Sequence, residues 1–256
     1  MNSCPPRAAF ALIQRGFRVI VVRPAREGAS VEPYKQQFID FMLRSGALKF
    51  GDFVTKSGRN TPFFINLGLF NSGSRIAQLG DYYALALRDR FGDDFDCLFG
   101  PAYKAIPLVV AASIALARHH ERDVPFCFNR KEAKDHGEGG NLVGHIPAAG
   151  QRVVIVEDVT TAGTSVRETR DLLAPLAGVR LVGLLVAVDR QERGPTGKQS
   201  ALAALRDDLG LATHAIVTLD EILAHLQGRR VGGKLILTPA LLSRIEAYRR
   251  QYGAAE

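Results

Sequence analysis

Long apolar runs and cysteine residues are both scarce in this chain of 256 residues. No apolar run approaches the roughly 18 residues that a helix needs to cross a bilayer, so we expect no membrane partner. The three cysteines, Cys4, Cys97 and Cys127, are odd in number and form no CxxC pair, which argues against a disulfide framework and against a structural zinc site. These absences favour a reducing compartment, and we expect the protein to be cytoplasmic.

Concentrated positive charge is also lacking in most of the chain. The formal net charge is +7, but residues 1–31 contain five arginines and one acid and so account for +4, which leaves only +3 for the remainder. The remainder has no lysine-rich stripe interleaved with aromatic side chains, so nucleic acid is not an expected partner. Residues 1–31 could be a targeting segment, a surface appendage or sequence upstream of the native start, and we expect a poorly ordered appendage.

Residues 32–256 are predicted to form one α/β domain with a sizeable core, because 46% of the chain is hydrophobic. A first helix is predicted to end at Gly46, and a short strand to cover residues 62–66. Runs that are apolar throughout, as in buried strands, occur at residues 95–99, 124–128, 153–156, 181–188 and 212–218. Further helices are predicted at residues 72–90, 104–118 and 164–176. This alternation is typical of a doubly wound, mainly parallel sheet with helices on both faces.

The strongest chemical signal is the segment VVIVEDVTTAGTS, residues 153–165. A buried strand ends in Glu157 and Asp158 and continues through small and hydroxyl-bearing residues into a helix. Backbone N–H groups at the start of that helix, together with the hydroxyls, can bind a phosphate. The acids can accept hydrogen bonds from the vicinal hydroxyls of a sugar. A 5-phosphorylated ribose offers both kinds of group, and neither a P-loop nor a GxGxxG motif is present to suggest another phosphate ligand.

This segment closely resembles the phosphoribosyl pyrophosphate signature of type I phosphoribosyltransferases. Around it, in order, occur KSGRNTPFFINLGLFNSG (56–73), FGPAYKAIPL (99–108), FNRKEAKDHGEGGNLVG (128–144) and AVDRQERG (187–194). Together these segments resemble the orotate phosphoribosyltransferases over about residues 32–253. The resemblance implies the type I fold with a small hood, built from residues 56–72 and parts near the C-terminus. It also implies transfer of the 5-phosphoribosyl group to N1 of orotate, giving orotidine 5′-monophosphate in pyrimidine biosynthesis.

Residues 130–150 lack clear periodicity and form a longer connection than is usual, so a functional loop is predicted there. Four potential cations, Arg130, Lys131, Lys134 and His136, lie within seven residues. Taken alone, such a string is typical of a solvated charged loop. Beside the signature, the same cations are expected to stabilise charge that grows on a leaving pyrophosphate. In the resembled family this loop closes over the site of the neighbouring subunit, which implies a homodimer with shared active sites.

Lys104 follows the strand predicted at residues 95–99, so its ammonium is expected at the same carboxyl end of the sheet. A cation at a helix start is unfavourable against the helix dipole, and this placement therefore favours a bound anion. The resemblance assigns Tyr103 and Lys104 to contacts with phosphoribosyl pyrophosphate. The residues expected to bind this substrate are Tyr103, Lys104, Arg130, Lys131, Lys134, His136, Glu157, Asp158, Val159, Thr160, Thr161, Ala162, Gly163, Thr164 and Ser165. Those expected to be catalytic are Lys104, Lys131, Lys134, His136 and Asp158.

Orotate is a flat ring with a carboxylate, and it therefore needs an apolar slot and a cation. The resemblance implies an orotate site made of Lys56, Phe63, Phe64, Thr161 and Arg190. An arginine suits this substrate because a guanidinium can bind a carboxylate through two hydrogen bonds. Without the resemblance, Phe63 and Phe64 could be core residues, and Arg190 could form an ion pair with Asp189 or Glu192.

Mg²⁺ is the expected cofactor, held mainly by pyrophosphate, ribose hydroxyls and water, with no direct protein ligand required. Two other functions remain open. One is a phosphoribosyltransferase for another base, which would need a different hood. The other is a regulator of the same fold that senses phosphoribosyl pyrophosphate, which would be expected to lose the loop cations and gain a basic face or an added domain.

Overall fold

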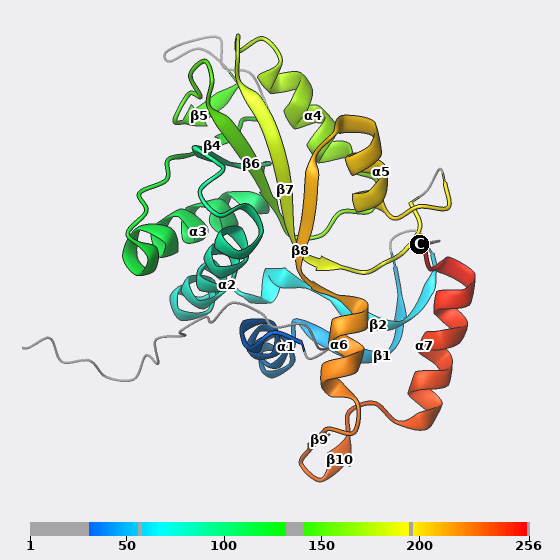
Figure 1. The fold of residues 1–256 in the computed structure, drawn as a ribbon. Helices are drawn as coiled ribbons and strands as arrows, with labels where there is room; N and C mark the ends of the chain where they lie inside the picture. Colours follow the sequence, from blue (N-terminus) through cyan, green and yellow to red (C-terminus); the bar gives the residue numbers. More distant parts are fainter. Residues whose placement is uncertain (1–30, 56–57, 132–140, 195–196, 255–256) are drawn as a thin grey trace, which may run out of the picture.

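The computed structural model describes residues 31–55, 58–131, 141–194 and 197–254. Its centre is a six-stranded sheet in the order β5-β4-β3-β6-β7-β8, shown in Figure 1. The strands are β3 (Cys97–Gly100), β4 (Phe126–Asn129), β5 (Leu142–Gly144), β6 (Arg152–Glu157), β7 (Arg180–Asp189) and β8 (Ala212–Thr218). All neighbouring strands run parallel except β4 and β5, which pair antiparallel. The predicted mainly parallel sheet is confirmed.

Both faces of the sheet are buried because its central strands are apolar through their middle positions, with polar residues only at their ends. On β6, Val154 and Val156 join the core on one face, whereas Val153 and Ile155 join the core on the other. Helices α2 (Gly73–Phe91) and α3 (Ala105–His120) cover the first face, and α4 (Thr164–Leu173) and α5 (Ala201–Leu209) cover the second. This arrangement confirms the doubly wound architecture.

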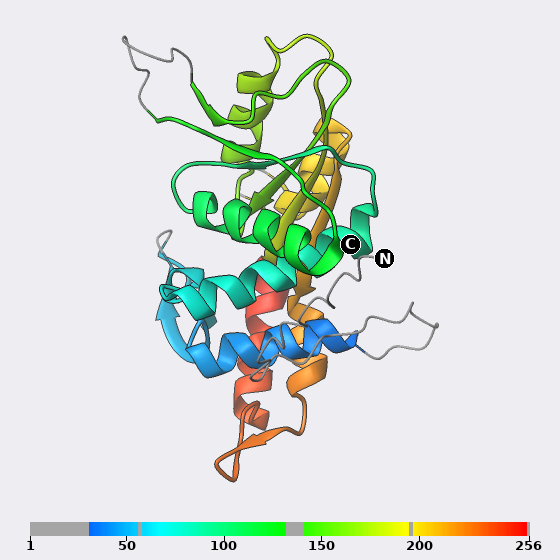
Figure 2. The ribbon, with the colours of Figure 1, turned by 90° about the vertical axis from the view of Figure 1, so that its left-hand side faces the viewer.

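The remaining elements gather below the central sheet in the views of Figures 1 and 2. They are α1 (Pro33–Ser45), β1 (Leu48–Val54), β2 (Asn60–Ile65), the short 3-10 helix η1 (Leu67–Leu69), α6 (Leu219–Leu226), β9 (Arg230–Val231), β10 (Lys234–Leu235) and α7 (Pro239–Tyr252). Strands β1 and β2 form an antiparallel hairpin. Phe63 of this hairpin packs with Leu219 and Tyr248 in a small core of its own. The hood therefore exists, but its first strand begins at Leu48, ahead of the predicted residues 56–72.

A partly buried ion pair joins α1 to α6. Lys35 is only 4% exposed, and its ammonium lies 2.6 Å from the Glu221 carboxylate. Glu221 also closes a capping box with Thr218 at the start of α6. This pair ties two distant parts of the chain together without contacting the signature segment.

Most predicted elements occur where the sequence indicates them. The first helix ends at Gly46, whose φ of 73° is the left-handed conformation that glycine adopts readily. The prediction of an irregular loop over residues 130–150 was wrong in one respect, because this segment contains strand β5, which pairs with β4. In addition, the Arg130 N–H donates a hydrogen bond to the Asn141 carbonyl (2.8 Å). The two described ends of this segment are thereby held side by side.

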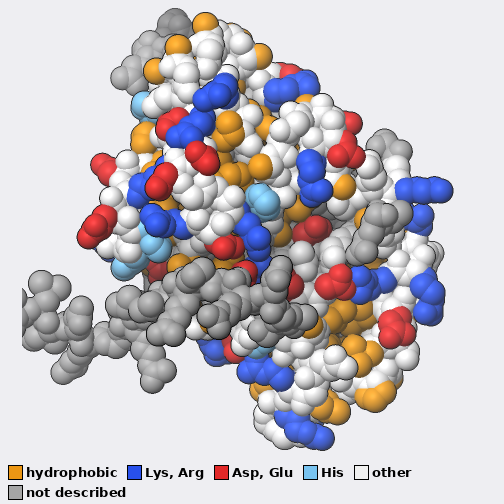
Figure 3. All heavy atoms as spheres, viewed as in Figure 1, with side chains coloured by type: hydrophobic (Ala, Val, Ile, Leu, Met, Phe, Trp, Pro, Cys, Tyr) orange, Lys and Arg blue, Asp and Glu red, His pale blue; other side chains and the backbone are white. Residues whose placement is uncertain are grey.

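The surface face in Figure 3 carries basic and acidic side chains interspersed over the elements. None of the helices within the described ranges is long and apolar enough to cross a membrane. Of the predicted appendage, only Val31 is described; it packs against the core and its carbonyl accepts a hydrogen bond from Gln36.

Candidate active site

The signature segment forms a strand, a short loop and a helix, as predicted. Strand β6 ends at Glu157 and α4 begins at Thr164. Gly163, the residue before α4, has a φ of 70°, and a Cβ placed there would lie 2.8 Å from a methyl of Leu205. Glycine is therefore required both by the backbone conformation and by the close approach of α5. The Gly163 N–H donates to the Thr160 hydroxyl (3.1 Å), which closes the loop around the start of the helix.

The two acids at the end of β6 have different surroundings. Glu157 is 7% exposed and accepts a hydrogen bond from the Ser165 hydroxyl at 2.6 Å. Asp158 is 9% exposed; one oxygen accepts from the Val159 N–H (2.7 Å) and the other lies 3.2 Å from the Lys104 ammonium. The pKa of Glu157 is raised to about 7, mainly by burial and also by the neighbouring Asp158 charge, against the opposing effects of the hydrogen bonds from Ser165 and the Asp158 N–H and of the Lys104 charge. Asp158 is thus paired with Lys104, whereas Glu157 is poised to hold a proton near neutral pH.

The raised pKa of Glu157 predicts a pH-dependent stability. A carboxyl that titrates near 7 when folded and near 4.5 when unfolded lets the folded state bind more protons between these pH values. Stability is therefore fully present below about pH 4.5 and is lost as the pH rises towards 7. Relative to Glu157→Gln, whose amide oxygen can still accept from Ser165, the ligand-free wild type should lose on the order of 2–3 kcal/mol between pH 5 and pH 8. Urea unfolding of both proteins at the two pH values measures this, and parallel pH profiles would contradict it.

The turn after β3 carries Tyr103 and Lys104 to the same end of the sheet. Both side chains are exposed, and Lys104 stands at the N-cap of α3. The Ala102 N–H in this turn donates to the side-chain oxygen of Asn129 at the end of β4 (2.7 Å). Asn129 directly precedes Arg130, so one amide side chain joins the turn to the start of the basic segment. Sequence reasoning missed Asn129, although its place at the carboxyl end of a predicted strand could have indicated it.

A cavity of about 370 Å³ unites most of the predicted residues. Its lining consists of Pro101, Ala102, Tyr103, Lys104, Lys131, Glu157, Val159, Thr160, Thr161, Ala162, Gly163, Thr164, Ser165 and Glu168. The cavity thus has cations on one side and the loop and helix start of the signature on the other. Glu168 was not predicted, although its spacing of three residues from Ser165 places it on the same helix face.

Some predicted residues lie away from this lining or beyond the described ranges. Neither Asp158 nor Arg130 lines the cavity; Asp158 adjoins it through its ion pair with Lys104, and the buried Nε of Arg130 has no hydrogen-bond partner among the described residues. Lys56, Lys134 and His136 lie outside the described residues. Their predicted roles stay predictions.

Part of the predicted orotate site lies together in the hood. The Arg190 guanidinium stands over the Phe63 ring at 4.7 Å and forms an ion pair with Glu192 at 2.6 Å. Phe63 is fully buried, whereas Phe64 is 36% exposed and stacks on Phe53. The core packing and the ion pair foreseen as alternatives from the sequence are therefore both present, and Phe64 is the ring of the two with an accessible face.

The hood residues connect to the signature through the segment that follows β7. A Cβ placed on Gly194 would lie 3.6 Å from the Thr161 carbonyl oxygen, so the two segments run close together. Thr161 is the residue predicted to serve both the phosphoribosyl and the base side. The geometry therefore brings the signature loop next to the segment that carries Arg190.

Comparison with known proteins gives a consistent assignment. A model of the phosphoribosyl transferase domain matches residues 70–202. The orotate phosphoribosyltransferase of Lachnoclostridium phytofermentans is 51% identical over 223 residues, which cover 87% of this chain and 99% of that protein. The one of Cronobacter sakazakii is 51% identical over 226 residues, with 87% and 100% covered. This chain belongs to the orotate phosphoribosyltransferase family.

The solved structures agree with this family. The crystal structure of the orotate phosphoribosyltransferase of Francisella tularensis matches with a TM-score of 0.74 and 35% identity, covering 85% of this chain and 100% of that chain. The predicted type I fold is confirmed, and the chain is a pentosyltransferase with a role in pyrimidine biosynthesis.

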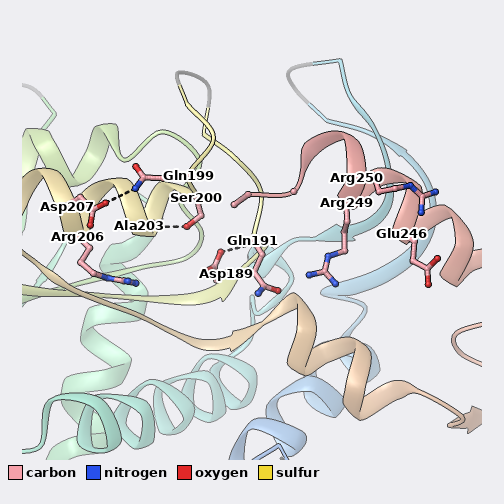
Figure 4. A pocket seen from close by; sticks show the side chains of 12 residues that line it. Asp189, Gln191, Gln199, Ser200, Ala203, Arg206, Asp207, Glu246, Arg249 and Arg250 are labelled. Carbon is pink, nitrogen blue, oxygen red and sulfur yellow. Dashed lines mark hydrogen bonds between the residues drawn. The ribbon is translucent and has the colours of Figure 1, made fainter. Parts of the chain in front are cut away.

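A second cavity of this family member, about 880 Å³, lies between the end of β7, α5 and the C-terminal end of α7. Figure 4 shows Gln191 between Asp189 and Arg249 in its lining. Gln191 has a φ of 52°, which is uncommon for a residue other than glycine. The following hydrogen bonds stabilise this conformation. The backbone N–H of Gln191 donates to the Asp189 carboxylate (2.8 Å). Its side-chain amide donates to the Asp220 carboxylate and accepts from the Asp220 N–H. Asp220 also pairs with Arg249 at 2.7 Å. None of the described residues predicted to bind substrate lines this cavity, but it flanks the segment that carries Arg190.

Proposed function

We propose that this chain transfers the 5-phosphoribosyl group from phosphoribosyl pyrophosphate to N1 of orotate, giving orotidine 5′-monophosphate and pyrophosphate. The observation that carries the proposal is the 370 Å³ cavity, in which the signature loop, the buried Glu157 and the cations Lys104 and Lys131 line one space. Asp158 adjoins this lining as the ion-pair partner of Lys104. Each part fits one part of the sugar donor. The choice of orotate as the acceptor is supported by the relatives named orotate phosphoribosyltransferase, which are about 50% identical to this chain.

The loop and helix start suit the 5-phosphate. Residues 160–165 offer small side chains, hydroxyls and the free N–H groups of the first turn of α4, and helix N-termini attract anions. Glu157 and Asp158 suit the ribose, because carboxylates at the end of a strand accept hydrogen bonds from vicinal hydroxyls. The substrate is thereby held at both ends while its C1 stays open to the base.

The cations suit the pyrophosphate leaving group. Breaking the bond between C1 and oxygen develops positive charge on the ribose and negative charge on pyrophosphate, and fixed cations stabilise the latter. Lys104 and Lys131 line the cavity, and we assign the same role to Arg130, Lys134 and His136. Tyr103 is proposed to contact the same substrate.

Mg²⁺ fits this site. Among the described residues, no group of three or more His, Cys, Asp and Glu side chains could hold a metal by themselves, whereas two adjacent carboxylates, Glu157 and Asp158, stand beside the proposed phosphate site. Mg²⁺ takes few protein ligands and keeps water and phosphate oxygens. The bound ion supplies charge neutralisation at the pyrophosphate.

On the base side, Lys56, Phe63, Phe64, Thr161 and Arg190 are proposed to bind orotate. Arg190→Ala should raise the orotate KM by about 10- to 100-fold, because a hydrogen-bonded contact to a charged group is lost. The KM for phosphoribosyl pyrophosphate should change little, since the guanidinium is proposed to meet only the pyrimidine. Steady-state kinetics with each substrate varied in turn measures the two constants. Equal changes in both would contradict the assignment of Arg190 to the base.

We also propose a cytoplasmic homodimer in which each active site borrows the basic loop of its partner, with neither nucleic acid nor a membrane as a partner. The test of the reaction follows the loss of orotate absorbance with phosphoribosyl pyrophosphate, with and without Mg²⁺. Consumption that needs both the sugar donor and Mg²⁺ is expected. Consumption of another base, or binding of the sugar donor without turnover, would replace the proposal by a different transferase or by a sensor of the same fold.

A further inference from the structure

Arg190 has two edges through which its guanidinium can bind a carboxylate. The side-on edge is made of Nε and one terminal nitrogen, and the end-on edge is made of both terminal nitrogens. In this structure the side-on edge is taken by Glu192, because one Glu192 oxygen accepts from Nε at 2.8 Å and from Nη2 at 2.6 Å. Both side chains are largely buried, at 14% and 15% exposure. The pair is therefore shielded from solvent and geometrically defined.

The end-on edge is left for another ligand. Among the described residues, nothing accepts a hydrogen bond from Nη1 of Arg190, and Nη2 has one further, long contact to the Thr61 hydroxyl at 3.5 Å. Thr61 itself donates to the Phe63 carbonyl (3.0 Å). The Phe63 ring closes one face of the guanidinium at 4.7 Å. The guanidinium is thus held between the Phe63 ring on one side and the Glu192 carboxylate along its side-on edge.

Glu192 is itself held by the end of the chain's last helix. It forms an isolated antiparallel bridge with Gly253. On either side of this bridge, the Arg193 N–H donates to the Tyr252 carbonyl and the Ala254 N–H donates to the Gln191 carbonyl, both at 2.9 Å. The segment that carries Arg190 and Glu192 is therefore clamped by backbone hydrogen bonds to the end of α7.

We propose that Glu192 is a positioning residue that turns Arg190 so that its end-on edge meets the orotate carboxylate. This inference rests on the proposed function. Because Glu192 occupies the side-on edge, the orotate carboxylate can bind only to the end-on edge. Glu192 also keeps the buried guanidinium paired while no orotate is bound. We expect its effect on orotate to act through Arg190, and Glu192 is not among the described residues that line the signature cavity.

Two substitutions separate orientation from charge. Glu192→Ala removes the acceptor and should raise the orotate KM roughly 10-fold while leaving the KM for phosphoribosyl pyrophosphate unchanged, the loss expected for one hydrogen bond to a charged group. Glu192→Gln keeps an oxygen that can accept from Nε and Nη2, and its orotate KM should stay within about threefold of wild type. The matched control is Glu221→Gln, which weakens the buried pair with Lys35 and should lower thermal stability without changing either KM.

A double-mutant cycle tests whether Glu192 acts through Arg190. In the Arg190→Ala background, Glu192→Ala should have no further effect on the orotate KM, because the group that it orients is absent. Additive effects, or an unchanged orotate KM in Glu192→Ala, would overturn the inference while the wild type still consumes orotate. A wild type that does not consume orotate at all would instead overturn the proposed function, so the two failures are distinguishable.

Discussion

Replacement of Asp158 by Asn should lower kcat/KM for phosphoribosyl pyrophosphate by about 30- to 900-fold, which corresponds to about 2–4 kcal/mol of transition-state stabilisation. Asp158 is 9% exposed, receives the Val159 N–H at 2.7 Å and pairs with Lys104 at 3.2 Å. Asparagine keeps the size of the side chain but removes the charge that pairs with Lys104 and that is proposed to meet the ribose. The loss falls on a buried contact, where neither water nor salt can replace it.

Steady-state kinetics on Asp158→Asn measures this loss. The control is Asp208→Asn, the same chemical change at an exposed carboxylate that pairs with Arg167 at 2.6 Å. It should keep wild-type kinetics, because surface ion pairs contribute little. Full activity in Asp158→Asn would show that the proposed ribose contact is misassigned.

Mixing two inactive variants should restore activity if the basic loop serves the partner subunit. Lys134→Ala homodimers and Asp158→Asn homodimers should each be nearly inactive. In a mixed dimer, one site receives both defects and the other receives neither, because an intact loop then closes over an intact signature. Random reassortment makes half of the dimers mixed, each with one competent site of two, so activity should recover to about one quarter of wild type. The defect of Lys134→Ala itself should fall mainly on kcat, since its cation is proposed to meet charge that develops in the transition state.

The structure supplies a matched control for this mixing experiment. Lys104 lies 3.2 Å from Asp158 of the same chain, so their defects belong to one subunit's site. Mixing Lys104→Ala with Asp158→Asn leaves every site of a mixed dimer defective and should restore nothing. Native mass spectrometry confirms subunit exchange in both mixtures. Absence of recovery with Lys134→Ala after verified exchange would mean that the loop serves its own subunit.

Much of this architecture could be predicted from local patterns. Strand β6 and the loop after it are contiguous in the sequence. The sequence could therefore predict the buried strand, the acid pair, the small loop residues and the start of the helix. The burial of both faces of the sheet likewise follows from strands that are apolar at consecutive positions through their middle. Helix ends such as Gly46 are determined by the conformational freedom of one residue.

Contacts between distant segments could not be predicted in the same way. Asp158 pairs with Lys104, and Ala102 is held by Asn129, only because the sheet order places β3 between β4 and β6. The short strands β1 and β5 lack a long periodic pattern and depend on their partners β2 and β4.

The proposed orotate site shows most clearly the difference between what local sequence predicts and what contacts between distant segments decide. The sequence by itself determined that two phenylalanines and an arginine stand at these positions, and it indicated both a ligand and a core interpretation for them. Only the tertiary structure decided that Phe63 turns into the hood core with Leu219 and Tyr248, and that Arg190 pairs with Glu192 above it. Alternation along a strand tells which side chains share a face, but what lies against that face, and which charge meets which, depends on segments that only folding brings together.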